Sequence, residues 1–467
     1  MATTKNGLWT PEVEAAHREL SALDVDFRRE ALASARLLDR GTFQDLHRAA
    51  AAFQYQGQSW PTFVDRRLVK ELERVSIDLS RVIRRLPEVV FNGDPARIAR
   101  FYGLPDADLV GLVLAEPNGI DGALSRGDFL LTGDGFRCIE FNMTSSLGGW
   151  EAGLIAEMLL HVPEVAEFVA RAAQPVTFTR TFRCIFEHLV SHAVQEGIPD
   201  DRIDTGLGHL GEVASADPGL ESALRAEYRA ALAASAPGFG GDVFFCDCRR
   251  IEERDGAIHH RGRRVHVLVE LFANLDDPRI FRAFKRGRLA LHNGPARGVL
   301  SDKRNLALLW EHRDSPRLQA EERRLIAESV PWTLRVVRGT VDVGGEECRL
   351  EEVLARRRER LVLKQGRSRG GEAVVLGKST SPSRWDEVAR EALEAEGEWV
   401  VQEALESKPY LYQHGAHGAA VHDLVWGPFV AGSAYAGAIL RAQPRGSGGG
   451  VVNLAHGATE GALLEVG

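Results

Sequence analysis

Residues 126–142 read RGDFLLTGDGFRCIEFN, two strand-like runs on either side of Gly133-Asp134-Gly135. Glycine and aspartate between such runs are typical of a β-hairpin turn. Taking these three residues as the hairpin loop makes Thr132 oppose Phe136, and counting back along both strands places Asp128 opposite Glu140. Because strand side chains alternate between faces, Asn142 then points to the same face as Glu140.

Two carboxylates directly opposite each other on a sheet repel, and aspartate is a poor strand former. A hard divalent cation is the simplest reason for this placement, since Mg²⁺ takes oxygen ligands and keeps water and phosphate oxygens in its shell. We therefore predict a metal site at Asp128, Glu140 and Asn142. Two alternatives stay open: a solvated polar hairpin face, and a register shifted by one residue that moves Asp128 to the other face.

A second cluster begins with an apolar run that ends in Lys364 and continues into a basic loop containing Gly370 and Gly371. The run Val374–Gly377 then returns as a second strand. Backbone N–H groups of such a loop can face nucleotide phosphates, and the lysine can supply a point charge to them. The loop is not a Walker A motif, because GxxxxGK[ST] is absent. A solvated basic hairpin is the alternative.

Two further clusters place polar residues at the ends of apolar elements. Gln402 and Glu403 end an apolar strand, where they could meet an adenine edge and a ribose, although a purely structural strand has the same pattern. Lys303 stands near the start of a predicted helix over residues 302–310.

A fifth cluster lies near the C-terminus. Arg441 and Asn453 flank the glycine-rich patch 445–450. This patch is either a flexible turn or a loop that closes over a ligand. Gly148-Gly149 also stands near a predicted helix start, where it either holds a substrate carboxylate through backbone N–H groups or forms a tight turn.

Composition bounds the class of protein. A chain of 467 residues predicts two or three domains, and 44% hydrophobic with 27% charged residues is typical of a globular protein. The net charge of -8 argues against a nucleic-acid binder. We see no apolar run of about 18 residues and no signal-peptide pattern, and the five cysteines form no disulfide framework. We therefore expect a cytoplasmic protein without nucleic-acid or membrane partners.

Together the five clusters resemble the circularly permuted ATP-grasp ligases, typified by the synthetase domain of glutathionylspermidine synthase. That family places R-x-D-F before E-x-N at the spacing seen here, and its N-K-x-x-x-x-L-L-W-E helix is matched by Ser301 to Glu311. Its K-P appears as Lys364-Gln365 and its Q-E pair as Gln402-Glu403. The matches run in family order over about residues 120–455.

The resemblance implies an α+β and α/β multidomain chain with a circularly permuted ATP-grasp fold, and ATP and Mg²⁺ as cofactors. It also implies an ADP-forming ligase that joins a carboxylate to an amine through an acyl phosphate. Arg126 would be the catalytic residue that stabilises the acyl phosphate and the tetrahedral intermediate, and Asp128, Glu140 and Asn142 would bind Mg²⁺. The residues expected to bind the nucleotide are Lys303, Lys364, Gly370, Gly371, Gln402, Glu403, Arg441 and Asn453.

The resemblance also predicts the organisation of the chain. We expect a mainly helical region over residues 1–115, a metal-binding part over 116–175, an α/β unit over 176–300 and a nucleotide-binding part over 301–467. The chain departs from the family where 143–149 reads MTSSLGG in place of A-D-T-P, where the usual proline is replaced by glutamine, and in lacking the amidase domain.

These departures leave the substrates open. The expected partners are a small-molecule carboxylate and an amine, such as a small peptide or an amino-acid metabolite, and a homodimer stays an open alternative. Two other activities also stay open: an ATP-grasp phosphotransferase that does not ligate, and a nucleotide-binding partner protein without catalysis.

Overall fold

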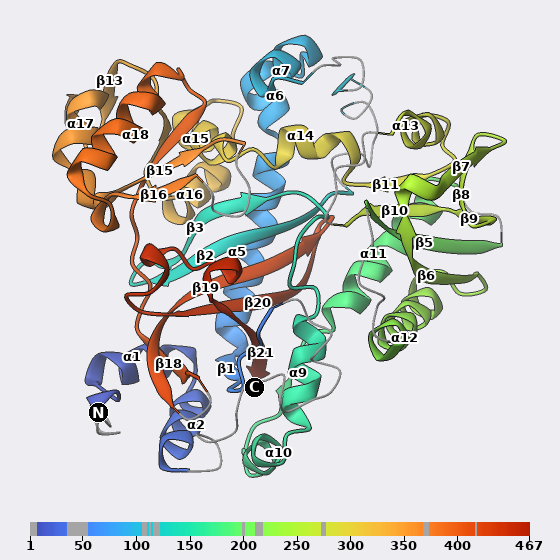
Figure 1. The fold of residues 1–467 in the computed structure, drawn as a ribbon, viewed down its shortest axis with the longest axis horizontal. Helices are drawn as coiled ribbons and strands as arrows, with labels where there is room; N and C mark the ends of the chain where they lie inside the picture. Colours follow the sequence, from blue (N-terminus) through green and yellow to red (C-terminus); the bar gives the residue numbers. More distant parts are fainter. Residues whose placement is uncertain are drawn as a thin grey trace.

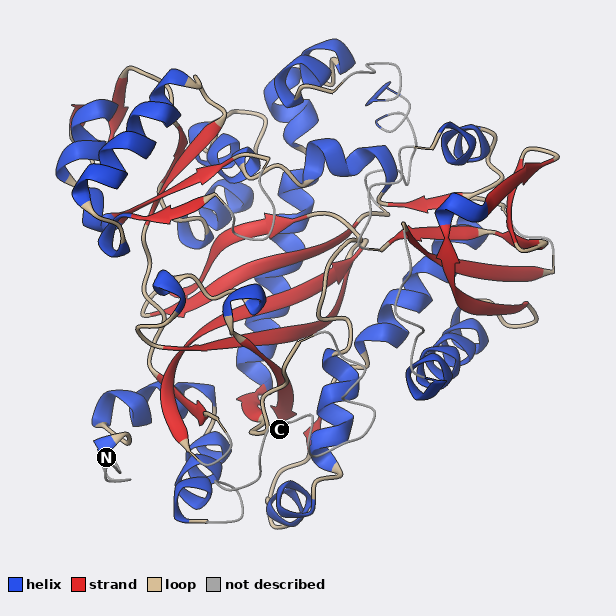
Figure 2. Cartoon of the chain, viewed as in Figure 1, coloured by secondary structure: helices blue, strands red, loops and turns tan. Residues whose placement is uncertain are grey.

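The chain is a mixed α/β protein with several sheets (Figure 1, Figure 2). The computed structural model describes residues 7–34, 55–104, 110–111, 114, 122–198, 201–210, 218–271, 277–367, 373–415 and 418–467. No helix in these ranges combines the length and the apolar character needed to cross a bilayer.

The central sheet collects strands from distant parts of the sequence. Its order is β1-β21-β20-β19-β2-β3, with β18 paired to β19 and β4 paired to β21. The predicted hairpin is β2 and β3, and it lies beside the C-terminal hairpin of β19 and β20. The strands are β1 (Thr62–Asp65), β2 (Leu124–Thr132), β3 (Gly135–Asn142), β4 (Val176–Thr177), β18 (Tyr410–Gln413), β19 (Ala419–Ala431), β20 (Ala434–Pro444) and β21 (Thr459–Val466).

The N-terminal region packs on this sheet. Residues 11–33 form two helices rather than one, because Ser21 is extended and its hydroxyl caps the second by accepting from the Asp24 N–H. Phe63 lies in β1, which pairs with β21, so helix α5 begins only after this strand. Helix α5, behind the sheet in Figure 1, buries apolar residues at helical spacing. The helices are α1 (Pro11–Leu20), α2 (Ala22–Ala33), α5 (Arg66–Arg84), α6 (Leu86–Phe91) and α7 (Pro95–Tyr102).

An α/β unit follows two linking helices, α9 (Ala152–Leu160) and α10 (Pro163–Ala170). Its four-stranded parallel sheet has the order β11-β10-β5-β6. The run Val267–Glu270 is buried throughout, as expected for a parallel strand covered on both faces. The elements are α11 (Thr181–Gln195), β5 (Arg202–His209), α12 (Pro218–Ser235), β6 (Gly240–Asp247), β7 (Ile251–Arg254), β8 (Ala257–His260), β9 (Arg263–Val265), β10 (Val267–Glu270), α13 (Pro278–Lys285), β11 (Ala290–His292) and α14 (Arg297–Leu300).

A third unit has its own antiparallel sheet, of order β12-β17-β15-β16, and its own hydrophobic core. Trp385 on α18 and Leu363 on β15 are fully buried in that core. The elements are α15 (Arg304–Glu311), α16 (Ala320–Ser329), β12 (Thr333–Arg335), β13 (Thr340–Asp342), β14 (Glu347–Arg349), α17 (Leu350–Arg356), β15 (Leu361–Gln365), β16 (Val374–Leu376), α18 (Pro382–Glu394) and β17 (Trp399–Glu403).

Candidate active site

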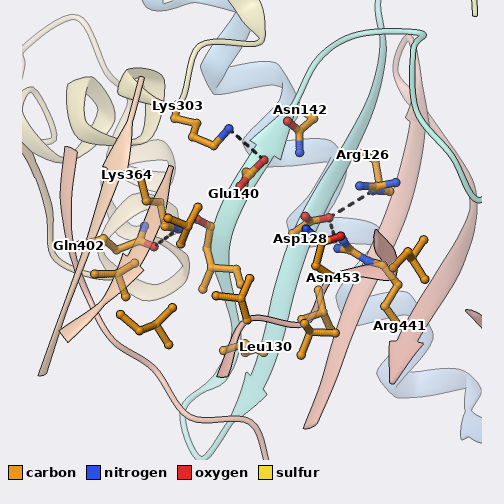
Figure 3. A pocket seen from close by; sticks show the side chains of 18 of the residues that line it. Arg126, Asp128, Leu130, Glu140, Asn142, Lys303, Lys364, Gln402, Arg441 and Asn453 are labelled. Carbon is orange, nitrogen blue, oxygen red and sulfur yellow. Dashed lines mark hydrogen bonds and ion pairs between the residues drawn. The ribbon is translucent and has the colours of Figure 1, made fainter. Parts of the chain in front are cut away.

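The register of the β2–β3 hairpin brings the predicted metal residues together. Asp128 opposes Glu140, as predicted from the sequence. The predicted turn is wrong by one residue, however, because Thr132 pairs with Gly135 rather than with the next residue. A β-bulge then leaves Ile139 without a partner on β2, and this extra residue restores the predicted pairing. Asn142 lies opposite Arg126, and its side chain is on the same face of the hairpin as Asp128 and Glu140 (Figure 3).

The bulge also connects the central sheet to the β12-β17-β15-β16 sheet. The main-chain oxygen of Ile139 accepts a hydrogen bond of 2.7 Å from Nζ of Lys364, which projects from β15. The same ammonium donates to Oε1 of Gln402 at 2.7 Å, and Nε2 of Gln402 donates to Thr333. Burial, together with the nearby Lys303 charge, lowers the pKa of Lys364 to about 8 against the opposing effect of Glu140. Gln402 therefore holds Lys364 beside the hairpin.

Lys303 approaches the same carboxylate face. It stands immediately before helix α15, as predicted, and its main-chain N–H donates to the Gly366 oxygen at 3.0 Å. This bond ties the helix start to the end of β15. Its Nζ lies 3.6 Å from Oε1 of Glu140 (Figure 3).

Two arginines neutralise Asp128. Oδ1 of Asp128 lies 2.6 Å from Nη2 of Arg441 on β20 and 3.2 Å from Nε of Arg126 on β2. Burial opposes ionisation of Asp128, but the two guanidiniums outweigh it and hold the pKa of this carboxyl below its usual value. With Lys303 at Glu140, the chain itself supplies cations to both carboxylates. Their repulsion therefore does not by itself require a metal, which corrects that step of the sequence argument.

Arg126 also fixes the segment that follows Asn142. Its Nη1 donates to the Gly148 oxygen at 2.8 Å. Gly149 has φ +96° and its oxygen accepts from the Ala152 N–H, so Gly148-Gly149 is a tight turn that precedes helix α9. A Cβ on Gly149 would lie only 3.0 Å from Ile439.

All the predicted site residues that the structure describes line one cavity of about 970 Å³. Gly370 and Gly371 lie outside the described residues. The cavity is bounded by the central sheet, the β15–β17 sheet and the segment between β20 and β21. The predicted residues in its wall are Arg126, Asp128, Glu140, Asn142, Lys303, Lys364, Gln402, Glu403, Arg441 and Asn453.

The oxygen donors fit a hard cation that also takes phosphate oxygens. Among the described residues, no group of three or more His, Cys, Asp and Glu side chains is placed to hold a metal by itself. Asp128, Glu140 and Asn142 offer two carboxylates and one amide, and all three face the cavity. A set this small suits Mg²⁺, which usually keeps substrate phosphates and water as its other ligands.

Sequence reasoning missed two pairs of residues near the cavity, Arg297 with Glu270 and Glu460 with Glu151. Arg297 lines it and is paired with buried Glu270. Glu460 lies opposite Arg441 in the sheet, and burial together with the neighbouring Glu151 raises its pKa to about 9. Neither pair belongs to a sequence motif. A carboxylate near the end of an apolar strand, as in both Glu270 and Glu460, is the signal that the sequence offers.

No family model matches the sequence, and no curated protein matches it. Solved structures that are similar to the chain include the following two. One is a glutathione synthetase-like effector from Globodera pallida in its apo form, with 12% identity, 87% of this chain and 89% of that chain covered, and a TM-score of 0.49. The other is a candidate gamma-glutamylcysteine synthetase from Methylobacillus flagellatus. It has 10% identity and a TM-score of 0.41, with 83% of this chain and 88% of that chain covered.

Fold and site together define a mixed α/β protein in which the central sheet and the β12-β17-β15-β16 sheet border one cavity lined by acidic and basic side chains. The β2–β3 hairpin contributes the carboxylates Asp128 and Glu140, while the basic side chains come from all along the chain. This arrangement has the parts needed to bind a polyanion together with a divalent cation.

Proposed function

We propose that the chain is an ATP- and Mg²⁺-dependent, ADP-forming ligase of the circularly permuted ATP-grasp type, which joins a carboxylate to an amine. One observation carries the proposal: ten motif residues spread between positions 126 and 453 line a single cavity. Motifs that matched by chance would have no reason to converge on one site.

ATP would lie between the β15–β17 sheet and the β2–β3 hairpin. Apolar side chains of Val362, Leu376 and Leu405 line this part of the cavity and suit a base. Lys364 and Lys303 flank Glu140 and would bring positive charge to the phosphates. Bound Mg²⁺ at Asp128, Glu140 and Asn142 would supply further charge neutralisation of the phosphates.

Arg126 and Arg441 stand at the other side of the hairpin and suit the reacting carboxylate. In the proposed reaction a carboxylate oxygen attacks the γ-phosphorus, and the bond to the ADP oxygen breaks with its electron pair. The amine then attacks the acyl carbon, phosphate leaves with the C–O electron pair, and the amine gives up one proton. Arg126 would stabilise the oxyanion of the tetrahedral intermediate, because a fixed guanidinium in a buried site costs little reorganisation.

Hydroxylamine trapping tests the proposal without knowledge of the natural amine. An enzyme that forms an acyl phosphate converts an acid, ATP and hydroxylamine into a hydroxamate, ADP and phosphate. We expect hydroxamate from at least one member of a panel of amino acids, dipeptides and dicarboxylic acids, and none without Mg²⁺. A stable phosphorylated product with no hydroxamate would identify a phosphotransferase, and nucleotide binding without ADP release would identify a non-catalytic protein.

A further inference from the structure

Arg297 is a partly buried cation in the cavity wall that the motifs do not include. Its side chain is 13% exposed, and Nη1 donates to Oε1 of Glu270 at 2.8 Å and to the Gly294 oxygen at 3.2 Å. Glu270 is fully buried. A buried carboxylate is costly unless it is paired, so Glu270 fixes the guanidinium at the edge of the cavity.

The Arg297–Glu270 pair lies at a place in the α/β unit where ligands commonly bind. Glu270 is the last residue of β10, so it lies at the carboxyl end of the parallel sheet. The chain runs from β5 to β6 on one side and later places β10 on the other side of β5. Open α/β sheets bind ligands outside the carboxyl ends of the strands at such a switch point.

A continuous set of contacts links Arg297 to the proposed reaction centre. The Ser145 hydroxyl lies 2.9 Å from the Glu270 main-chain oxygen and 2.8 Å from that of His292. Three residues later, the Gly148 oxygen accepts from Arg126. The short segment between Ser145 and Gly148 therefore spans from the Glu270 strand end to Arg126, and it borders the cavity along the way.

The chemistry at this end of the cavity suits an anion. The hydroxyl residues Thr144, Ser146 and Ser301 line the same cavity as Arg297, and the Ser301 hydroxyl donates to the Arg297 main-chain oxygen. A guanidinium has five N–H donors in a planar fork that matches a carboxylate, so one arginine can hold both a structural carboxylate and a ligand carboxylate. Cationic side chains outnumber acidic ones in the cavity wall as a whole.

We infer that the acid substrate carries a second carboxylate, which Arg297 binds while the reacting carboxylate lies at Arg126. This inference rests on the proposed function and narrows its substrate to dicarboxylic acids, including acidic amino acids and peptides with a free distal carboxylate. Binding at two fixed arginines would orient the reacting end of the acid toward ATP.

Matched substrate pairs test the inference. Each diacid is compared with its monoamide in the hydroxamate assay: glutarate with glutaramate, aspartate with asparagine, glutamate with glutamine, and glycyl-glutamate with glycyl-glutamine. The wild type should use at least one diacid at least tenfold more efficiently, in kcat/KM, than its monoamide. A tenfold ratio corresponds to about 1.4 kcal/mol, within the range of one charge-assisted hydrogen bond.

The informative variant is E270Q/R297Q, because R297Q alone would leave Glu270 buried without its cation. In this double variant the diacid-to-monoamide ratio should fall to about one, mainly through a raised KM for the diacid. Calorimetry with the diacid, a non-hydrolysable ATP analogue and Mg²⁺ should show the same loss of binding. E311Q/R335Q removes a comparable 2.7 Å pair whose residues do not line the cavity, and it should keep the wild-type ratio.

Three results would overturn the inference. If the ratio is unchanged in E270Q/R297Q, Arg297 does not bind the distal carboxylate. If every diacid and its monoamide are used equally by the wild type, the site does not select a second carboxylate. If no acid in the panel gives a hydroxamate, the proposed ligase function fails and the inference fails with it, which separates this outcome from the other two.

Discussion

Replacing Asp128 with asparagine should destabilise the protein as well as inactivate it. Asp128 bridges Arg126 and Arg441, and all three side chains are only 10–11% exposed. D128N keeps the shape but leaves two guanidiniums close together without their shared anion. Removing one partner of a buried ion pair typically costs about 3–5 kcal/mol. Taking about 3 kcal/mol, and about 2–4 °C per kcal/mol for a large domain, we expect Tm to fall by about 6–12 °C.

The control is E30Q, which removes the anion from an exposed pair with Arg171 whose N–O distance is 2.7 Å. The side chains of that pair are 57% and 44% exposed, so the loss should stay below about 1 kcal/mol. Differential scanning fluorimetry on the wild type and both variants at pH 7 measures the effect. A D128N midpoint within 2 °C of that of E30Q, a threshold we set at roughly 1 kcal/mol, would refute the burial argument.

The pH dependence of the same variant gives an independent check. The folded-state pKa of Asp128 lies below its usual value, so its stabilising contribution is present above the unfolded-state pKa of about 4. That contribution is lost as the pH falls through the folded-state value. The difference in Tm between wild type and D128N should therefore be constant from pH 5 to 8 and shrink below about pH 4. A difference that instead shrinks between pH 6 and 8 would point to another titrating group.

Three further outcomes are expected. Because the pKa of Lys364 is lowered to about 8, its charge is lost as the pH rises through that value. The affinity for ATP, measured by calorimetry, should therefore fall between pH 7.5 and 9. The K364M variant should bind ATP weakly, and its affinity should not change over this pH range. G149A should unfold about 1–3 kcal/mol more easily in urea, since φ is +96° and the added methyl meets Ile439. S21A should cost about 1–2 kcal/mol in the same assay, since its hydroxyl caps α2 and donates to the Phe63 oxygen. An ATP affinity that does not change with pH, or an unfolding free energy that does not change in G149A or S21A, would contradict the corresponding prediction.

The sequence predicted the facing of Asp128 and Glu140 through two errors that cancel. A two-residue turn replaces the predicted three-residue loop, which alone would move every later residue of β3 by one position. The bulge at Ile139 moves them back. Alternation and turn residues indicate a hairpin and its approximate length, but they contain no signal for a bulge. Its cause becomes visible only when Lys364 is seen to bind the Ile139 oxygen from another sheet.

Local motifs also could not show which residues meet across the fold. Arg441 contacts Asp128 because β19 and β20 lie between β21 and β2, an order that no periodicity of the chain determines. Glu270 and Arg297 are 27 residues apart, and their pairing depends on how β11 and α14 follow β10. The strands themselves could be predicted from their apolar residues. A strand inside the fold is buried whichever strand it pairs with, and burial selects apolar residues.

The two carboxylates of the hairpin are held with different strength, which decides how the cavity can change on binding. Asp128 is bound at 2.6 Å and 3.2 Å by two arginines whose own positions are fixed by the sheet. Among the described residues, Glu140 forms its ion pair with the Lys303 ammonium at 3.6 Å, and lysine is a flexible point charge. In the proposed function, an arriving polyphosphate would compete for Lys303 more easily than for the arginines. Glu140 would then be the carboxylate released from its cation, and a divalent ion entering with the phosphates would meet an open carboxylate there.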